Sequence, residues 1–215
     1  MITEKPLVSI NNLSIRYNTS AGIVSAVEGI NFYIREKEIF ALVGESGCGK
    51  STTAYALMRL ISEPGEITGG NIIFQDQDLL SLSHKEMFNI RGKKISMIFQ
   101  NPLDSLNPVL RIRSQVSEAI VLDKISKKAA WKKAVEIIKE VKIPDADERA
   151  NSYPFELSGG MRQRVMIGMM ISRKPKLLIA DEPTTALDVT IQAQILEIIK
   201  DLKEEIGTSI LLITH

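Results

Sequence analysis

One segment, residues 44–51, constrains the fold of this chain more than any other. It reads GESGCGKS and matches the pattern G-x-x-x-x-G-K-[ST]. The apolar run Ile39–Val43 precedes it, and a helical stretch at residues 52–60 follows it. In such a strand, loop and helix, the glycines let successive N–H groups turn inward, and the helix start adds partial positive charge. The segment therefore predicts a site for the phosphates of ATP.

Two side chains of this loop have specific expected roles. Lys50 is expected to place its ammonium on the β and γ phosphates, and Ser51 is expected to offer its hydroxyl to Mg²⁺. The other residues expected to bind the nucleotide belong to the loop or directly follow it: Gly44, Glu45, Ser46, Gly47, Cys48, Gly49 and Thr52. A chance match is rare, because the fixed positions and the strand and helix context must all agree.

Alternating strand and helix patterns predict an α/β fold with a parallel sheet. Three short apolar runs are interpreted as buried strands: residues 39–43, 177–180 and 210–213. The phosphate loop follows the first run, Asp181 and Glu182 follow the second, and His215 follows the third. Because the carboxyl ends of parallel strands meet at one edge of a sheet, we expect these groups to share one site.

Two further regions differ from this core. Alternating apolar residues between 8 and 34 predict an antiparallel N-terminal β subdomain. Helical spacing, clearest at residues 126–141, predicts an inserted helical subdomain, and its lysines are interpreted as a solvated helix face. We therefore expect a single domain in which residues 1–100 and 174–215 form the core with its β subdomain, and residues 101–173 form the helical subdomain.

Composition and charge argue against several classes of protein. Lys and Arg number 27 against 26 Asp and Glu, so no net field favours nucleic acid as a partner. The single cysteine, Cys48, cannot form an internal disulfide, which suits a reducing compartment. No apolar run approaches the ~18 residues that cross a bilayer, and residues 1–7 lack the apolar core of a signal peptide. We expect a chain that is soluble by itself.

The adjacent carboxylates Asp181 and Glu182 are expected to have different roles. Neighbouring side chains at a strand end point in different directions. Asp181 is expected to hold a magnesium-bound water, and Glu182 to orient or deprotonate the water that attacks the γ-phosphate.

Further segments extend the pattern along the chain. Gln100 follows an apolar run, LSGGMRQR occupies residues 157–164, and ALD occupies residues 186–188. Together with the phosphate loop, the acidic pair and His215, these segments resemble the nucleotide-binding subunit of an ATP-binding-cassette (ABC) transporter over nearly the whole chain. The resemblance implies a P-loop NTPase core of the ABC ATPase type, with magnesium-dependent ATP hydrolysis coupled to transport.

The resemblance also assigns roles to residues that carry little signal alone. Tyr17 stands in the place of the aromatic residue that stacks on adenine, Gln100 links magnesium to the transmembrane partner, and His215 is the γ-phosphate switch. Four residues would face the ATP held by the opposite subunit: Ser158, Gly159, Gly160 and Gln163. The implied magnesium ligands are Ser51, Gln100 and Asp181. The implied catalytic residues are Glu182, His215, Lys50 and Gln100.

Two longer stretches are similar to the ATPase subunits of oligopeptide and dipeptide importers: QNPLDSLNP at residues 100–108 and TTALDVTIQAQIL at residues 184–196. This similarity implies a peripheral protein on the cytoplasmic face of the cell membrane. Its implied partners are transmembrane permease subunits, a second ATPase subunit that is the same or a related chain, and, indirectly, an extracellular solute-binding protein. Related systems carry nickel or sugars, so the solute stays open.

The sequence leaves two alternative functions. One is a soluble ABC ATPase of the DNA repair or translation type, although the segment between Gln100 and Leu157 is too short for a long coiled-coil insertion. The other is a nucleotide-sensing module without turnover, which the presence of Glu182 disfavours.

The chain also departs from the family pattern. Lys37 stands where the family usually has glycine, and Phe155 stands where these importers commonly have histidine. Family members continue past the histidine equivalent to His215, so we expect a domain truncated at its C-terminus.

Overall fold

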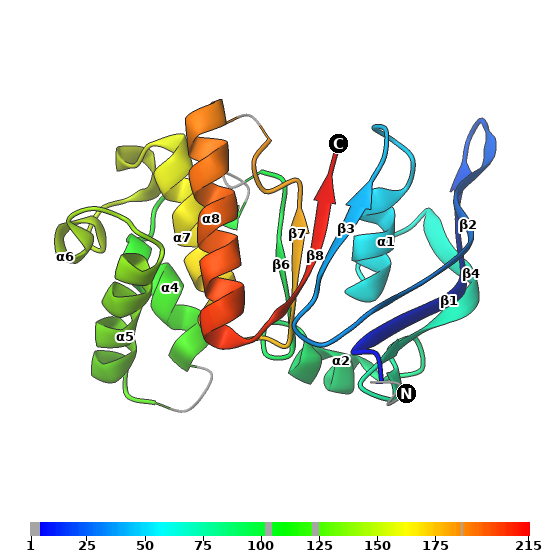
Figure 1. The fold of residues 1–215 in the computed structure, drawn as a ribbon, viewed down its shortest axis with the longest axis horizontal. Helices are drawn as coiled ribbons and strands as arrows, with labels where there is room; N and C mark the ends of the chain where they lie inside the picture. Colours follow the sequence, from blue (N-terminus) through cyan, green and yellow to red (C-terminus); the bar gives the residue numbers. More distant parts are fainter. Residues whose placement is uncertain (1–4, 102–104, 122–124, 186) are drawn as a thin grey trace.

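The computed structural model describes residues 5–101, 105–121, 125–185 and 187–215. Residues 102–104 and Ala186, which belong to the stretches that resemble peptide importers, lie outside the described residues, as do residues 1–4. Figure 1 shows three parts side by side: a group of helices, a central parallel sheet, and an antiparallel sheet on the other side. Within the described residues, no helix is long and apolar enough to cross a membrane.

The parallel sheet has the strand order β3-β8-β7-β6. Its strands are β3 (Ile39–Val43), β8 (Ser209–Thr214), β7 (Leu177–Asp181) and β6 (Ile95–Ile98). The three strands predicted from apolar runs are therefore confirmed, and β6 forms the edge beside β7. Because all four strands run in parallel, their carboxyl ends lie at one edge of the sheet, which is the geometry expected for the site.

The antiparallel sheet has the order β2-β1-β4-β5. It consists of β1 (Val8–Thr19), β2 (Gly22–Ile34), β4 (Gly65–Phe74) and the short β5 (Gln77–Asp78). Val8 and Ile10 of β1 are buried, and Leu13 and Ile15 are buried after a register shift in the strand, in agreement with the predicted antiparallel β subdomain. Helix α1 (Lys50–Leu57) lies between the two sheets, and α2 (His84–Ile90) lies near one end of them (Figure 1).

The remaining helices cover the other face of the parallel sheet (Figure 1). They are α4 (Ile112–Val121), α5 (Lys127–Glu140), α6 (Ala146–Arg149), the 3-10 helix η1 (Pro154–Glu156), α7 (Gly159–Ile171) and α8 (Val189–Ile206). Ser126 and Asp188 cap α5 and α8, each accepting a hydrogen bond from a first-turn N–H. The exact limits of a helical subdomain stay a prediction.

Two local features of the helices depend on tertiary contacts. On α5, the ring of Trp131 is only half-buried and lies beneath the cations of Arg113 and Lys127, at 4.4 and 5.2 Å. Helix α1 was expected to reach residue 60, but it ends at Leu57, and Arg59 has a left-handed backbone with φ 49°.

The strands of the parallel sheet contribute to two hydrophobic cores. Leu178 and Ala180 of β7 pack with α4, α5, α7 and α8, whereas Leu177 and Ile179 pack with the antiparallel sheet and α1. Successive side chains of a strand point to opposite faces, so a sheet covered on both sides needs apolar residues at every position. This requirement explains why β7 is a continuous apolar run. Packing on both faces of the strand also fixes the position of Asp181 at its carboxyl end.

Candidate nucleotide-binding site

The phosphate loop joins the carboxyl end of β3 to the first turn of α1. Gly49 has φ 93°, and a Cβ at this position would lie 2.4 Å from the carbonyl oxygen of Ala26. Only glycine fits this backbone without displacing β2. The loop conformation is therefore determined both by its own residues and by the neighbouring strand.

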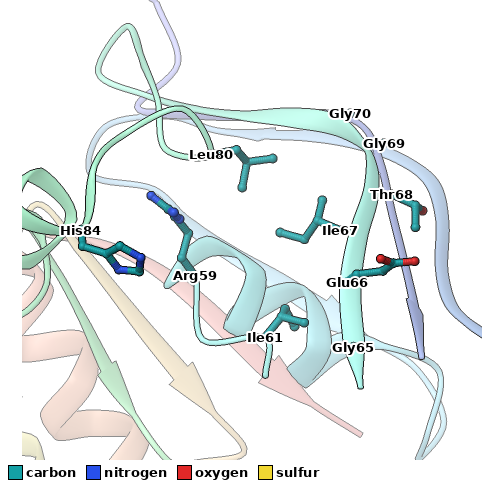
Figure 2. A pocket seen from close by; sticks show the side chains of 10 residues that line it. All are labelled: Arg59, Ile61, Gly65, Glu66, Ile67, Thr68, Gly69, Gly70, Leu80 and His84. Atoms are coloured by element: carbon teal, nitrogen blue, oxygen red, sulfur yellow. The ribbon is translucent and has the colours of Figure 1, made fainter. Parts of the chain in front are cut away.

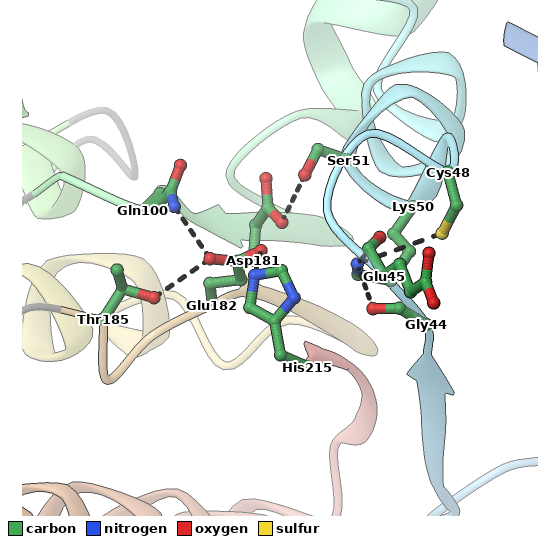
Figure 3. A network of polar contacts seen from close by, with 10 residues as sticks. All are labelled: Gly44, Glu45, Cys48, Lys50, Ser51, Gln100, Asp181, Glu182, Thr185 and His215. Atoms are coloured by element: carbon green, nitrogen blue, oxygen red, sulfur yellow. Dashed lines mark hydrogen bonds and ion pairs between the residues drawn. The ribbon is translucent and has the colours of Figure 1, made fainter.

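The side chain of Lys50 folds over the loop that precedes it. Its Nζ donates hydrogen bonds to the carbonyl oxygens of Gly44 and Glu45, each at 2.7 Å, and lies 4.0 Å from Sγ of Cys48 (Figure 3). The lysine is only 6% exposed, and no carboxylate within the described residues forms an ion pair with it. A buried ammonium held mainly by carbonyl groups provides a favourable site for an anion.

Ser51 and Asp181 meet at the centre of the site. The Ser51 hydroxyl donates to Oδ1 of Asp181 at 2.8 Å, although the two residues are far apart in the sequence. Asp181 is 1% exposed, and its burial raises the pKa of the carboxyl, with the nearby Glu182 adding to the rise and the Ser51 hydrogen bond opposing it. The carboxylate and hydroxyl thus form a compact oxygen site at the start of α1.

Glu182 points away from Asp181, as expected for neighbouring residues at a strand end. One carboxylate oxygen accepts from Gln100 Nε2 at 2.7 Å and from Thr185 Oγ1 at 3.0 Å, while the other lies 2.7 Å from Nε2 of His215 (Figure 3). Its φ of 46° lies in the left-handed region, which is uncommon for a residue other than glycine. Strained backbone of this kind is typical of functional sites.

The structure therefore brings together residues from four separate parts of the chain. Gln100 follows β6, Asp181 and Glu182 end β7, His215 follows β8, and the phosphate loop follows β3. Sequence reasoning did not identify Thr185 as a site residue. Its only local signal was a hydroxyl in the polar turn after Glu182, and turn hydroxyls are common.

Residues 158–160 do not join this cluster. Ser158 is the exposed N-cap of α7 and accepts a hydrogen bond from the Met161 N–H at 3.3 Å. Gly160 packs so closely on α8 that a Cβ would lie 2.8 Å from Cγ2 of Ile191. In Figure 1, α7 and α1 lie on opposite sides of the parallel sheet. A phosphate held by Lys50 therefore cannot contact Ser158 of the same chain.

Gln163 requires a correction. The sequence assigned it to the surface that faces a nucleotide, but its side chain is 1% exposed and donates from Nε2 to the carbonyl oxygen of Pro183 at 2.6 Å. In this chain Gln163 supports the turn that follows Glu182. We therefore interpret Gln163 as a positioning residue.

Tyr17 and Lys37 have clear structural settings. Tyr17 is half-buried on β1, and a Cβ on the paired Gly65 would lie 2.6 Å from its ring, so the ring needs the glycine beside it. Lys37 has φ 56° and donates from its backbone N–H to Oγ of Ser209. This left-handed conformation is the one that glycine adopts most easily, which explains the glycine of the family pattern at the position of Lys37.

The oxygen groups at the start of α1 fit a magnesium ion. Mg²⁺ commonly takes one or two carboxylates together with substrate phosphates and water. Asp181 supplies a carboxylate beside the Ser51 hydroxyl, and Gln100 supplies an amide whose nitrogen is already bonded to Glu182. The described residues contain no group of three or more His, Cys, Asp or Glu arranged around a metal. The arrangement suits an ion that arrives with phosphates.

Comparison with known sequences finds relatives that are ATP-binding proteins of peptide transport. The chain is 53% identical over 217 residues to the oligopeptide transport ATP-binding protein OppD of Bacillus subtilis, covering 100% of this chain and 61% of that protein. It is 49% identical to the dipeptide transport ATP-binding protein DppD of the same organism, covering 97% of this chain and 63% of that protein. The chain thus spans less than two thirds of the length of these relatives.

Solved structures and family membership agree with the fold. A dimeric ATP-binding cassette in a post-hydrolysis state with ADP and phosphate has a TM-score of 0.85 and 30% identity, covering 97% of this chain and 88% of that one. A cassette from Clostridium perfringens, part of an ABC transporter complex, has a TM-score of 0.82 and 27% identity, covering 99% of this chain and 79% of that one. The ABC transporter family profile matches residues 27–185. With this match across most of the chain, on a P-loop α/β core, the chain belongs to the ABC transporter family.

Proposed function

We propose that this chain binds and hydrolyses ATP as a subunit of an ABC importer whose solute is a peptide. The observation that carries the proposal is the position of Glu182, whose two carboxylate oxygens are held by Gln100, Thr185 and His215 beside the phosphate loop. A carboxylate oriented in this way is suited to position and deprotonate a water molecule. The names of the related proteins support peptides as the solute.

Nucleotide binding follows from the groups around the loop. Lys50 would exchange the carbonyl oxygens of Gly44 and Glu45 for phosphate oxygens, since its donors already point into the loop. The N–H groups of the loop and the start of α1 would hold the remaining phosphate oxygens. Tyr17, with its half-buried ring, would contact the base. Ser51, Asp181 and Gln100 would hold Mg²⁺, which neutralises phosphate charge when bound.

Hydrolysis needs a correctly placed water and stabilisation of the charge on the γ-phosphoryl group. Glu182 would accept a proton from the water, while Gln100 and Thr185 fix one of its oxygens. His215 is 51% exposed and touches the other oxygen, so it can turn from Glu182 toward a phosphate. These roles consist of positioning and electrostatic stabilisation, which dominate phosphoryl transfer.

A complete site requires a second ATPase subunit. Because the Ser158–Gly160 segment and Lys50 lie on opposite sides of the sheet, we infer that this segment contacts ATP bound to a partner subunit. The partner is the same chain or a related one. Permease subunits would anchor the pair at the cytoplasmic face of the membrane, and an extracellular solute-binding protein would deliver the peptide indirectly.

The proposal is tested by assembling the full-length protein with its permease and solute-binding partners in proteoliposomes. We expect ATP hydrolysis that depends on Mg²⁺, rises when peptide-loaded binding protein is added, and accompanies peptide uptake. Nickel and a sugar serve as comparison solutes. Hydrolysis without solute dependence would favour the soluble ATPase alternative, and nucleotide binding without phosphate release would favour a sensing module.

A further inference from the structure

A hollow lies beside the antiparallel sheet, apart from the nucleotide site. Its volume is about 530 Å³, and it is bounded by Ile61, Leu80, Arg59, His84 and the segment 65–70 of β4. We call it the β4 groove. Six consecutive residues of one strand contribute to its wall, so the hollow runs along the strand (Figure 2).

The strand that forms this wall has an open edge. β1 pairs with β4 along its length, but β5 pairs only with Ile73 and Phe74. Within the described parts of the chain, residues 65–71 therefore have no strand on their second edge. Unpaired N–H and C=O groups along an edge are a template for another extended chain.

The floor and the far wall of the groove have different chemistry. Ile61, Ile67 and Leu80 point into the hollow, whereas Glu66 and Thr68 point away from it (Figure 2). Arg59 and His84 lie across from β4. A strand placed beside β4 would therefore have apolar side chains beneath it and cationic or hydrogen-bonding groups along its other side.

The positive charge beside the groove is not neutralised within the described residues. Arg59 donates from Nη1 to the carbonyl oxygens of Leu79 and Leu82, and Arg91 donates to those of Met58 and Arg59. Neither arginine forms a salt bridge there. Burial, and then repulsion from Arg59, lower the pKa of Arg91. The nearby Asp78 carboxylate already accepts from two backbone N–H groups.

We propose that the β4 groove binds a short peptide in an extended conformation, which adds as a strand to the open edge of β4 and places its terminal carboxylate beside Arg59 and His84. A strand of five residues is about 17 Å long, which matches the ~20 Å length of a six-residue wall. This site goes beyond the proposed ATPase function and does not depend on it.

The probe is the pentapeptide Ac-Thr-Val-Thr-Val-Thr with a free carboxylate, compared with the same peptide as a carboxamide. In ¹H–¹⁵N NMR spectra of the chain, we expect the carboxylate peptide to shift the amide signals of Gly65, Gly69 and Gly70, while the signals of Gly47 and Gly49 stay in place. The amide peptide should bind at least ~threefold more weakly, because it lacks one exposed ion pair. Equal affinities, or no shift in β4, would overturn the proposal.

Two variants separate a role in binding from a loss of folding. His84 begins α2 and is exposed, so His84→Glu adds an acid where a helix start favours one. We expect this variant to weaken binding of the carboxylate peptide by at least ~threefold. Lys85→Glu changes the next residue, which does not line the groove, and it should leave the affinity near that of the parent chain.

Backbone methylation tests the addition of a strand directly. Alternate N–H groups of the peptide would face β4, and the others would face away. Two probes, N-methylated at the even or at the odd positions, should therefore differ, with only one of them losing binding. If both methylated probes lose binding, or if both keep it, strand addition is contradicted. It is also contradicted if sedimentation shows that the NMR shifts come from self-association of the chain.

Discussion

The first turns of α1 and α7 both have the partial positive charge of a helix start, but their surroundings differ. Both begin at glycine-containing segments, and a helix start attracts anions in either case. Around α1 the fold adds the Lys50 ammonium and, through Ser51, the Asp181 carboxylate. Around α7 the N-cap Ser158 is exposed, and Gly160 is occupied with packing on α8.

The difference fits the proposal that the start of α1 forms most of one site and that the start of α7 contributes to the site of a partner subunit. The α1 region has a counter-charge, an oxygen site for a cation and a positioned carboxylate, whereas the α7 region has an exposed cap. Substitutions in the two regions should therefore affect ATP binding and turnover differently.

The largest effect is expected from Glu182→Gln, which keeps the shape of the side chain but removes its basicity. We expect the turnover rate of the assembled complex to fall by about 10²- to 10⁴-fold, the range for a positioned base. ATP affinity should persist, because Lys50 and the loop are unchanged. Phosphate release and equilibrium nucleotide binding are measured on the same preparation. Turnover at the native rate would remove Glu182 from the mechanism.

Lys50→Ala is expected to weaken binding of Mg-ATP by roughly 100-fold, since the loop loses charge-assisted hydrogen bonds to phosphate. Isothermal titration calorimetry measures the dissociation constant. Lys85→Ala is the control, because it removes an exposed lysine outside the loop. Unchanged affinity in the Lys50 variant would mean that the phosphates do not lie at the start of α1.

Ser158→Arg should preserve ATP affinity in the isolated chain, since Ser158 lies on the other side of the sheet from Lys50. In a complex with two copies of the chain, Lys50→Ala and Ser158→Arg should each lower turnover strongly at an ATP concentration that only just saturates the native complex. Mixing the two variants should restore about a quarter of the native rate if the copies pair at random, because each mixed pair contains one intact composite site. A mixture as inactive as its components would argue against composite sites built from copies of this chain.

The smallest expected effect is on stability. Burial raises the pKa of Asp181, so this carboxyl favours the fold below its unfolded pKa, and the benefit is lost as pH rises through the folded pKa. Asp181→Asn should therefore raise the free energy of unfolding at pH 7, by less than about 2 kcal/mol, with a smaller gain near pH 4. The Asn oxygen can still accept from Ser51.

Urea denaturation at both pH values measures this difference. Asp201→Asn is the matched control, because it removes the 2.8 Å contact with Lys142 on the surface and relieves no buried charge. A lower free energy of unfolding for Asp181→Asn at pH 7 would show that the contacts of the buried carboxylate more than offset the cost of burying its charge.

Much of the fold could be predicted from local patterns. The apolar runs of β3, β7 and β8 are continuous because both faces of the parallel sheet are covered, and the alternation in β1 reports a sheet with one buried face. The ends of helices were less predictable. Helix α1 stops at Leu57 because the chain turns at Arg59, whose guanidinium bonds to a distant loop.

The site was predicted in part, for a similar reason. Lys50 and Ser51 belong to one short segment whose spacing alone predicts phosphate binding. The contact of Glu182 with Thr185, the burial of Gln163 and the half-exposed ring of Trp131 depend on side chains brought close by folding. No local pattern reports such contacts.

The sequence by itself determined the phosphate loop, the parallel core and the acidic strand end, because each depends on the spacing of residues within one short segment. Only the tertiary structure decided that Glu182 is held by Gln100, Thr185 and His215, that Gln163 supports a turn, and that the start of α7 lies away from Lys50. The physical reason is that hydrogen-bond partners and burial depend on which strands lie side by side, and strand order is fixed by packing between distant segments.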